Sequence, residues 1–198
     1  MIRNTEILRD TDPRCADLEA KGYVLVGESW GARLLLEPGQ DLGAYTRAVN
    51  LALGKRVDIQ ELNIEFVDEL LALELINNAD YPFTPATLRA LPTEESIRAL
   101  WCPENLVFGA LFEGVLIGAI STSGSDELVE LDFASILSEH RGKGIGKALA
   151  AAAILEWVER GNRAFGTGGA MANAASLGTV GSLGFSIEER WRSYQPPL

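Results

Sequence analysis

The sequence predicts a mixed α/β domain in which helices flank a central sheet. Two apolar, β-rich runs at 105–112 and 115–123 meet at Glu113-Gly114, a dipeptide typical of a hairpin turn. The segment 146–159 is rich in alanine and leucine, which favour helix. From residue 56 onward, strand-like and helix-like segments follow in the order β-α-α-β-β-β-α-β-α-β, which is a mixed α/β pattern.

The region that precedes the hairpin is predicted to hold one strand and two helices. Residues 56–62 alternate apolar and polar side chains, as in a half-buried strand. Residues 65–78 place apolar side chains at helical spacing before asparagines and a proline end the segment. Thr93 is a suitable N-cap for a second helix that we expect to extend to residue 101.

After the hairpin, the same signals alternate between strand and helix. We expect a strand at 127–137, then the helix at 146–159, which Gly161-Asn162 ends. A short strand near 164–171, a weaker helix from Asn173 to Gly184 and a last strand at 185–194 complete this part of the chain.

Residues 1–55 are treated as an N-terminal extension to a domain at 56–198. They predict a short strand, a helix beginning at Asp12-Pro13, a hairpin-like pair at 22–29 and 31–37, and a helix near 41–53. The passage 16–30 is similar in texture to 180–191, because in both a helix ends before glycine, an aromatic residue and a strand. Two interpretations stay open, a half-repeat that contributes strands to the sheet and chance reuse of a common junction.

Composition restricts the partners and the location. The formal net charge of −11 argues against nucleic-acid binding, because the phosphate backbone would be repelled. The charge suits a positively charged amine substrate, or it simply keeps the protein soluble. We find no apolar run of about 18 residues and no signal-peptide core, so we expect a cytoplasmic protein without a membrane partner. The two cysteines predict neither a disulfide framework nor a metal site.

The turn between the strand at 127–137 and the helix at 146–159 predicts a pyrophosphate site. Unpaired backbone N–H groups lie at a helix start, and glycines at 142, 144 and 146 let a phosphate approach them closely. The helix dipole, Arg141, Lys143 and Lys147 add positive charge. Other glycine motifs fit worse, since Ala148 replaces the Ser or Thr of a Walker A loop and a dinucleotide fingerprint would need its glycines at other positions.

The segment Arg141-Gly-Lys-Gly-Ile-Gly146 has the pattern Arg/Gln-x-x-Gly-x-Gly/Ala, which resembles the coenzyme A pyrophosphate loop of the GNAT superfamily of N-acetyltransferases. Asn173 and the Leu183-Gly184-Phe185 ending resemble later features of the same superfamily. The resemblance covers residues 57–198 and implies a mixed, mostly antiparallel sheet flanked by helices, with acetyl-coenzyme A as the acyl donor and no metal.

The resemblance also implies site residues. Backbone groups at the end of the strand would pair with the pantetheine arm, and Asn173 would contact or place that arm while also capping its helix. The residues implied in cofactor binding are Ala134, Ser135, Ile136, Arg141, Gly142, Lys143, Gly144, Ile145, Gly146, Lys147 and Asn173.

The implied chemistry is attack of a primary amine on a thioester, which requires a group that removes a proton from the amine. Glu130 is the candidate base, since it lies 11 positions before Arg141 (141 − 130), as in the histone-acetylating members that this strand resembles. Alternation along the strand predicts that Glu130 and Asp132 share one face, opposite Val129, Leu131 and Phe133, where two carboxylates would raise each other's pKa. A backbone N–H near Ile136 would stabilise the oxygen that gains charge.

The sequence departs from the superfamily in two places. Val180 occupies the position of the tyrosine that protonates the leaving thiolate, and Ser176 is a weaker candidate for that role. Only one strand fits after Phe185 where the superfamily has two, so we expect residues 1–55 or a partner subunit in a homodimer to supply the missing strand. The acceptor is expected to be a small-molecule amine or a protein amine. The alternative function is a catalytically weak sensor of acyl-coenzyme A.

Overall fold

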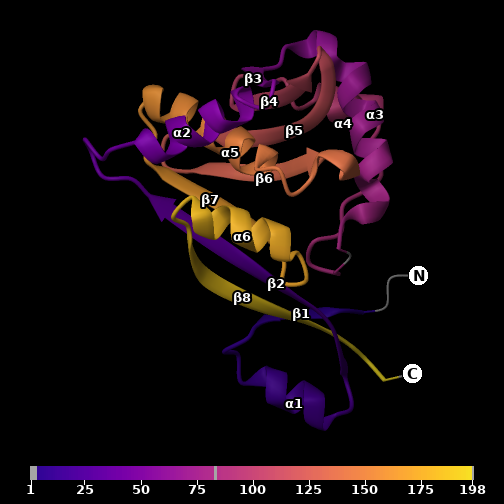
Figure 1. Ribbon diagram of the computed structural model, residues 1–198. Helices are drawn as coiled ribbons and strands as arrows, with labels where there is room; N and C mark the ends of the chain where they lie inside the picture. Colours follow the sequence, from indigo (N-terminus) through magenta and orange to yellow (C-terminus); the bar gives the residue numbers. More distant parts are fainter. Residues whose placement is uncertain (1–3, 83, 198) are drawn as a thin grey trace.

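The structure is a computed structural model that describes residues 4–82 and 84–197 (Figure 1). The described residues form one eight-stranded sheet in the order β1-β8-β2-β7-β6-β5-β4-β3. The strands are β1 (Glu6–Arg9), β2 (Val24–Leu35), β3 (Val57–Glu61), β4 (Asn105–Phe112), β5 (Val115–Gly124), β6 (Val129–Ile136), β7 (Ala164–Ala170) and β8 (Ser186–Gln195). The α-helices are α1 (Arg14–Ala20), α2 (Gly43–Leu53), α3 (Val67–Asn77), α4 (Glu94–Arg98), α5 (Ile145–Glu159) and α6 (Ala174–Ser182).

The sheet is mixed and mostly antiparallel, as predicted. Every strand pair is antiparallel except β6 with β7. The parallel pairing of β6 with β7 covers only Val129–Leu131 and Phe165–Thr167, although both strands continue beyond it. The two strands therefore diverge in the middle of the sheet (Figure 1).

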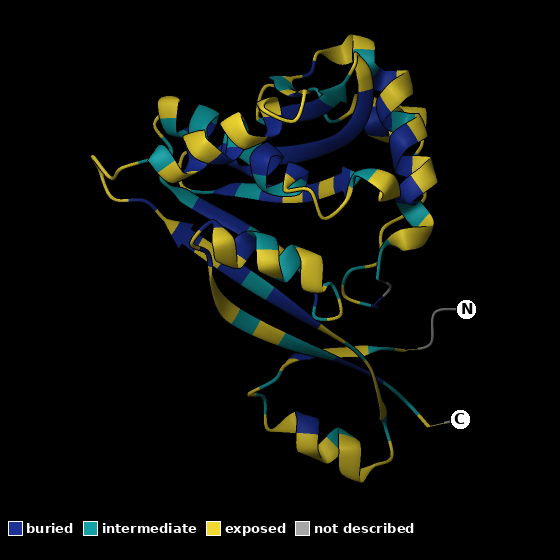
Figure 2. Cartoon of the chain, viewed as in Figure 1, coloured by how far each residue is buried: buried dark blue, intermediate teal, exposed yellow. Residues whose placement is uncertain are grey.

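Helices cover the two faces of the β3–β6 half of the sheet. The larger core cluster joins α2 and α5 to one face and includes Ile117 and Ile120 of β5. The smaller cluster joins α3 and α4 to the opposite face and includes Leu116 and Ala119 of the same strand. Both faces of β5 are therefore buried (Figure 2), which explains why its first six residues are apolar or glycine, without alternating polar positions.

The segment predicted as a hairpin at 22–37 is instead the single long strand β2, so that prediction was wrong. Gly31 does not turn the chain, because it lies in extended backbone paired with Gly168 of β7 and Glu189 of β8. Trp30 is only 2% exposed, and its indole N–H donates to the carbonyl of Ala170 at 3.2 Å. The strand between β7 and β8 therefore comes from the N-terminal quarter of the chain.

The outer ends of β2 and β8 extend away from the main body together with β1 and α1 (Figure 1). A separate small core of Leu8, Cys15 and Tyr194 holds this part together. The Tyr194 hydroxyl donates to Glu19 at 2.7 Å, and burial raises the pKa of Tyr194 to about 12. Cys15 is buried, is a free thiol, and donates to the carbonyl of Arg9 at 3.3 Å.

Most other elements lie within two residues of their predicted bounds. Thr93 and Ser96 form the reciprocal hydrogen bonds of a capping box at the start of α4. The helix ends at Arg98 rather than at residue 101. At the β4–β5 turn, Glu113 and Gly114 both have positive φ, at 53° and 82°, as a tight hairpin turn requires. Among the described helices, none combines the length and apolarity that a membrane span requires.

Candidate active site

The glycine turn at 141–147 leads directly into α5. Gly142 and Gly144 adopt left-handed backbone, with φ of 70° and 84°, which glycine tolerates without strain. The first N–H that closes a helical hydrogen bond is that of Ala148, to the carbonyl of Gly144 at 3.0 Å. The N–H groups of residues 145–147 precede it and donate to no backbone carbonyl in the described part of the chain, so they can serve an external acceptor. A Cβ at 142 or 144 would meet no heavy atom within 4 Å, so the turn is open on that side.

The start of α5 lies against the end of β6. A Cβ placed on Gly146 would come within 3.1 Å of the Ile136 side chain, so glycine permits this close contact. An anion at the helix start would therefore lie next to the strand that was predicted to pair with the pantetheine arm.

Positive charge surrounds the turn, and part of it comes from outside the motif. The ammonium of Lys55, which follows α2, donates to the carbonyl of Lys143 at 2.8 Å. Lys147 donates to the carbonyl of Ser182 at 3.1 Å. Sequence reasoning did not identify Lys55, because nothing in its local sequence indicates that the chain returns to this turn.

Arg141 joins the turn to the end of α3. Its guanidinium donates to the carbonyl of Ile136 at 2.7 Å and to Asn77 Oδ1 at 2.8 Å, and it pairs with Asp80 at 2.7 Å. The Asn77 amide in turn donates to Ser135 Oγ at 2.7 Å. Arg141 therefore fixes the position of the β6 end relative to α3, in addition to carrying charge.

Beyond Leu131, β6 and β7 diverge, and we call the space between them the gap. The edge of β6 that faces this gap presents backbone carbonyls. The carbonyl of Ala134 accepts a hydrogen bond from the Tyr81 hydroxyl at 3.1 Å, and that of Ile136 accepts from Arg141. Ala134 is exposed, whereas the Ser135 side chain is buried against α3. Beyond Leu131, β7 no longer pairs with β6, so this edge is available to another extended partner.

Glu130 lies where β6 and β7 are still paired, opposite Gly166. Its Oε1 accepts from the Arg33 guanidinium of β2 at 3.0 Å, and about 39% of its side chain is exposed. A Cβ on Gly166 would clash with this carboxylate and with the guanidinium. Glycine at 166 therefore leaves the space in which Glu130 and Arg33 meet at the entrance to the gap.

A β-bulge at Asp132 changes which side chains share a face. Between β5 and β6 the register advances by one residue from Ser121 to Thr122 but by two from Leu131 to Phe133, which leaves Asp132 as the extra residue. Leu131 packs in the larger core cluster, on the face that α2 and α5 cover. The Phe133 ring instead faces Arg89, 4.4 Å from the guanidinium carbon. The prediction that Phe133 lies opposite Glu130 and Asp132 was therefore wrong, because simple alternation ignores the bulge.

Asp132 is accessible to water but crowded by protein atoms. This partial desolvation raises the pKa of the Asp132 carboxyl, while a hydrogen bond from Ser123 Oγ at 3.0 Å and the charge of Arg89 oppose the shift. The raised pKa of Asp132 thus comes from desolvation and not from the neighbouring carboxylate.

The α6 region carries the predicted cap. Asn173 Oδ1 accepts from the Ser176 N–H at 3.1 Å, so Asn173 caps α6. Val180 is 7% exposed and packs in the larger core cluster, and its side chain has no proton to donate. A hydroxyl near β6 comes instead from Tyr81, on a different segment.

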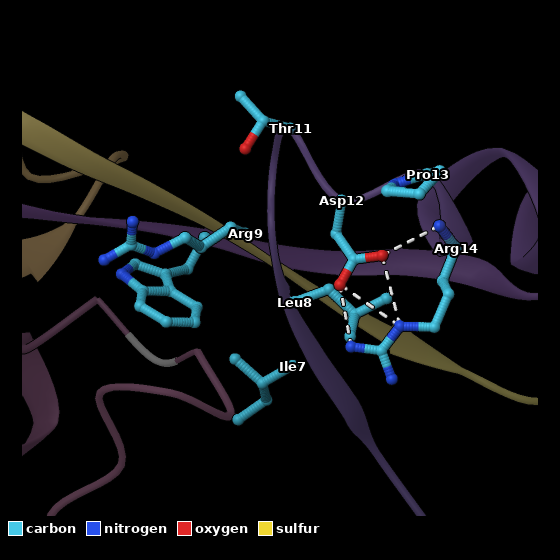
Figure 3. Close-up of a pocket in the computed structure, with 8 residues that line it drawn as sticks. Ile7, Leu8, Arg9, Thr11, Asp12, Pro13 and Arg14 are labelled. Atoms are coloured by element: carbon cyan, nitrogen blue, oxygen red, sulfur yellow. Dashed lines mark hydrogen bonds and ion pairs between the residues drawn. The ribbon is translucent and has the colours of Figure 1, made fainter.

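One hollow lies away from these residues. It has a volume of about 430 Å³, and its lining is Ile7, Leu8, Arg9, Thr11, Asp12, Pro13, Arg14 and Trp191 (Figure 3). In it Asp12 accepts hydrogen bonds from the backbone and side chain of Arg14, and Arg9 lies over the Trp191 ring. None of the predicted site residues lines this hollow, so we do not assign it to the active site.

The model of the acetyltransferase (GNAT) family matches residues 71–185, more than half of the chain. This chain belongs to the GNAT acetyltransferase family. The matched segment contains the glycine turn, Glu130, the divergent part of β6 and β7, and Asn173. A search of curated proteins found no match.

Solved GNAT structures share the fold at low sequence identity. A GCN5-related N-acetyltransferase from Sphaerobacter thermophilus aligns with a TM-score of 0.73 and 14% identity over 98% of this chain and 60% of its own. A tandem GNAT protein from the clavulanic acid biosynthesis pathway gives 0.62 and 19%, over 96% and 62%. The PaiA N-acetyltransferase from Thermoplasma acidophilum, in complex with coenzyme A, gives 0.59 and 18%, over 70% and 98%. This chain thus spans about 60% of the length of the first two.

Proposed function

We propose that this GNAT chain transfers an acetyl group from acetyl-coenzyme A to a primary amine, with Glu130 as the general base. The observation that carries the proposal is the glycine turn, whose free N–H groups lie beside Ile136 at the end of β6. This part of β6, beyond Leu131, is no longer paired with β7. A family member with such a turn has both parts of a donor site, an anion cradle and an unpaired strand edge.

The residues present fit coenzyme A. The N–H groups at the start of α5, with Lys55 and Lys147 beside them, suit a pyrophosphate. The exposed edge at Ala134 suits an amide-containing arm, and Asn173 borders the far side of the gap at the end of β7. When bound, acetyl-coenzyme A supplies an activated acyl group as a thioester.

The positions of its two carboxylate oxygens make Glu130 suitable as the general base. Arg33 contacts Oε1, which leaves Oε2 able to accept a proton from an approaching amine. The carboxylate lies over Gly166 at the entrance to the gap, where donor and acceptor would meet. Arg33 holds the side chain in position, and the N–H near Ile136 would stabilise the oxygen that gains negative charge.

Thermal unfolding with and without millimolar acetyl-coenzyme A tests the donor site. A ligand present at about 100 times its Kd raises stability by roughly 2.7 kcal/mol, so the parent should melt at a higher temperature. Gly144→Glu places a negative charge in the cradle and should abolish the rise. Gly39→Glu is the matched control, since Gly39 also has positive φ and an open surrounding but lies between β2 and α2. Absence of a rise in the parent would refute the proposed donor.

The competing function is an acyl-coenzyme A sensor with little catalysis, which the valine at 180 favours. A saturable, amine-dependent release of free thiol that Glu130→Gln lowers at least tenfold would support the enzyme. Cofactor binding without any amine-dependent release would support the sensor instead.

A further inference from the structure

A buried carboxylate on α3 lies beneath the segment that follows this helix. Glu74 is 3% exposed and lies among the apolar side chains by which α3 packs on the sheet. Its Oε2 pairs with Arg89 Nη1 at 3.0 Å, while its Oε1 is buried without a hydrogen-bond partner among the described residues. A buried charge is costly unless it is fully paired, so this oxygen has capacity for one more donor.

Arg89 reaches this carboxylate from outside. Its side chain is 43% exposed, and its guanidinium carbon lies 4.4 Å from the ring centre of Phe133 and 5.5 Å from that of Tyr81. A hollow of about 60 Å³ adjoins the pair and is lined by Glu74, Tyr81 and Arg89, among others. The cation that pairs with Glu74 thus lies against two aromatic rings, and a carboxylate and ring faces both attract positive charge, so the same place is suited to an organic cation.

This arrangement adjoins the gap between β6 and β7. Phe133 follows the bulge on β6, and the Tyr81 hydroxyl donates to the carbonyl of Ala134, on the edge assigned to the donor. Asp132, next to Phe133, adds a second carboxylate near Arg89. An acceptor bound here would therefore extend from the cation-binding residues to the reacting groups.

We propose that Glu74, Tyr81 and Phe133 form a cation subsite that Arg89 fills in the free protein and that a second positive charge of the acceptor fills during the reaction. The acceptor class is thus an amine with at least two basic groups, one of which reacts while the other stays charged. Exchange of one cation for another is feasible because the released Arg89 side chain is long, partly exposed and readily hydrated. The inference rests on the proposed acetyl transfer only for its catalytic consequence.

Binding is tested without coenzyme A. The melting temperature is measured with 1,4-diaminobutane and with 1-aminobutane at equal ionic strength, so that only the second charge differs. The parent should gain more from the diamine, and Arg89→Ala should gain more still, because the competing guanidinium is gone. Glu74→Gln should lose the difference between the two amines. Equal shifts with both amines in the parent and in Arg89→Ala would overturn the subsite.

Two controls keep the result specific. Glu94 and Arg98 form a matched ion pair on the surface of α4, at 2.8 Å. Glu94→Gln and Arg98→Ala make the same charge changes and should behave as the parent does. If Glu74→Gln does not fold, Phe133→Leu removes a ring without touching a buried charge, and it should reduce the diamine shift. An unchanged shift in Phe133→Leu would count against the subsite.

Kinetics separate this inference from the proposed function. If acetyl transfer occurs, the preference in kcat/KM for the diamine over the monoamine should fall at least about tenfold in Glu74→Gln. If no amine supports transfer but the diamine still stabilises the parent and not Glu74→Gln, the proposed enzyme fails and the subsite stands. Transfer with an unchanged preference in Glu74→Gln would refute the subsite alone.

Discussion

The carboxylate of Glu130 and the α-carbon of Gly166 face each other across the parallel pair of β6 and β7, one residue before that pairing stops. The space that a side chain at 166 would fill holds the Glu130 carboxylate and the Arg33 guanidinium. Three strands thus each contribute a residue to this contact, since Arg33 belongs to β2. Because this point lies at the entrance to the gap, small changes there should affect transfer more than stability or donor binding.

Gly166→Ala should lower amine-dependent transfer by about tenfold or more, because its methyl group displaces the Glu130–Arg33 pair and a small misplacement of a catalytic group is costly. Steady-state thiol release measures the effect, and the melting shift with acetyl-coenzyme A should persist. Gly178→Ala is the control: Gly178 lies in α6, where an added Cβ would meet nothing within 4 Å apart from its chain neighbours and its own helix backbone, and the variant should gain about 0.5–1 kcal/mol of stability. Full activity in Gly166→Ala would argue against Glu130 as the base.

Lys55→Gln should weaken binding of acetyl-coenzyme A several-fold, because it removes an ammonium held at the carbonyl of Lys143 beside the proposed phosphate cradle. Calorimetric titration at low and high salt gives the measurement, and the difference from the parent should shrink as salt screens the charge. An affinity equal to that of the parent at low salt would show that Lys55 only ties the turn to the residues after α2.

Asp132→Asn should stabilise the protein at neutral pH. Desolvation raises the pKa of Asp132 in the folded state, so the unfolded chain ionises more readily and the carboxylate costs stability once pH exceeds the ordinary value of 3.8. As pH falls below that value the gain from asparagine should vanish, since the acid is then protonated in both states. Urea midpoints of both proteins between pH 3 and pH 8 test the trend, and a gain that grows toward acid would contradict it.

Trp30→Ala should cost about 3–5 kcal/mol of unfolding free energy, the usual loss for a buried indole. Trp30 is 2% exposed in β2 and donates to the carbonyl of Ala170 in β7. Leu35→Ala, at a position on the same strand that is 69% exposed, should cost far less. Urea unfolding measures both, and equal losses would mean that β2 does not contribute to the main core.

Local signals in the sequence determined most of the elements and the glycine turn before α5. Thr93, Glu113-Gly114 and the glycine turn at 142–146 each act through contacts or backbone angles of their immediate neighbours, so their structure follows from nearby residues. The segment that matches the GNAT family model, residues 71–185, contains all three of these features.

Tertiary structure alone decided that β2 lies between β7 and β8 and which groups surround the carboxylates of Glu130 and Asp132. Gly31 looked like a turn because glycine permits one, but pairing with both β7 and β8 keeps it extended. The bulge at Asp132 moved Phe133 to the face that holds Arg89, and register shifts depend on the partner strand rather than on local sequence. Glu130 contacts Arg33, 97 positions away, and Lys55 contacts the glycine turn at Lys143, 88 positions away, and no local pattern specifies either contact.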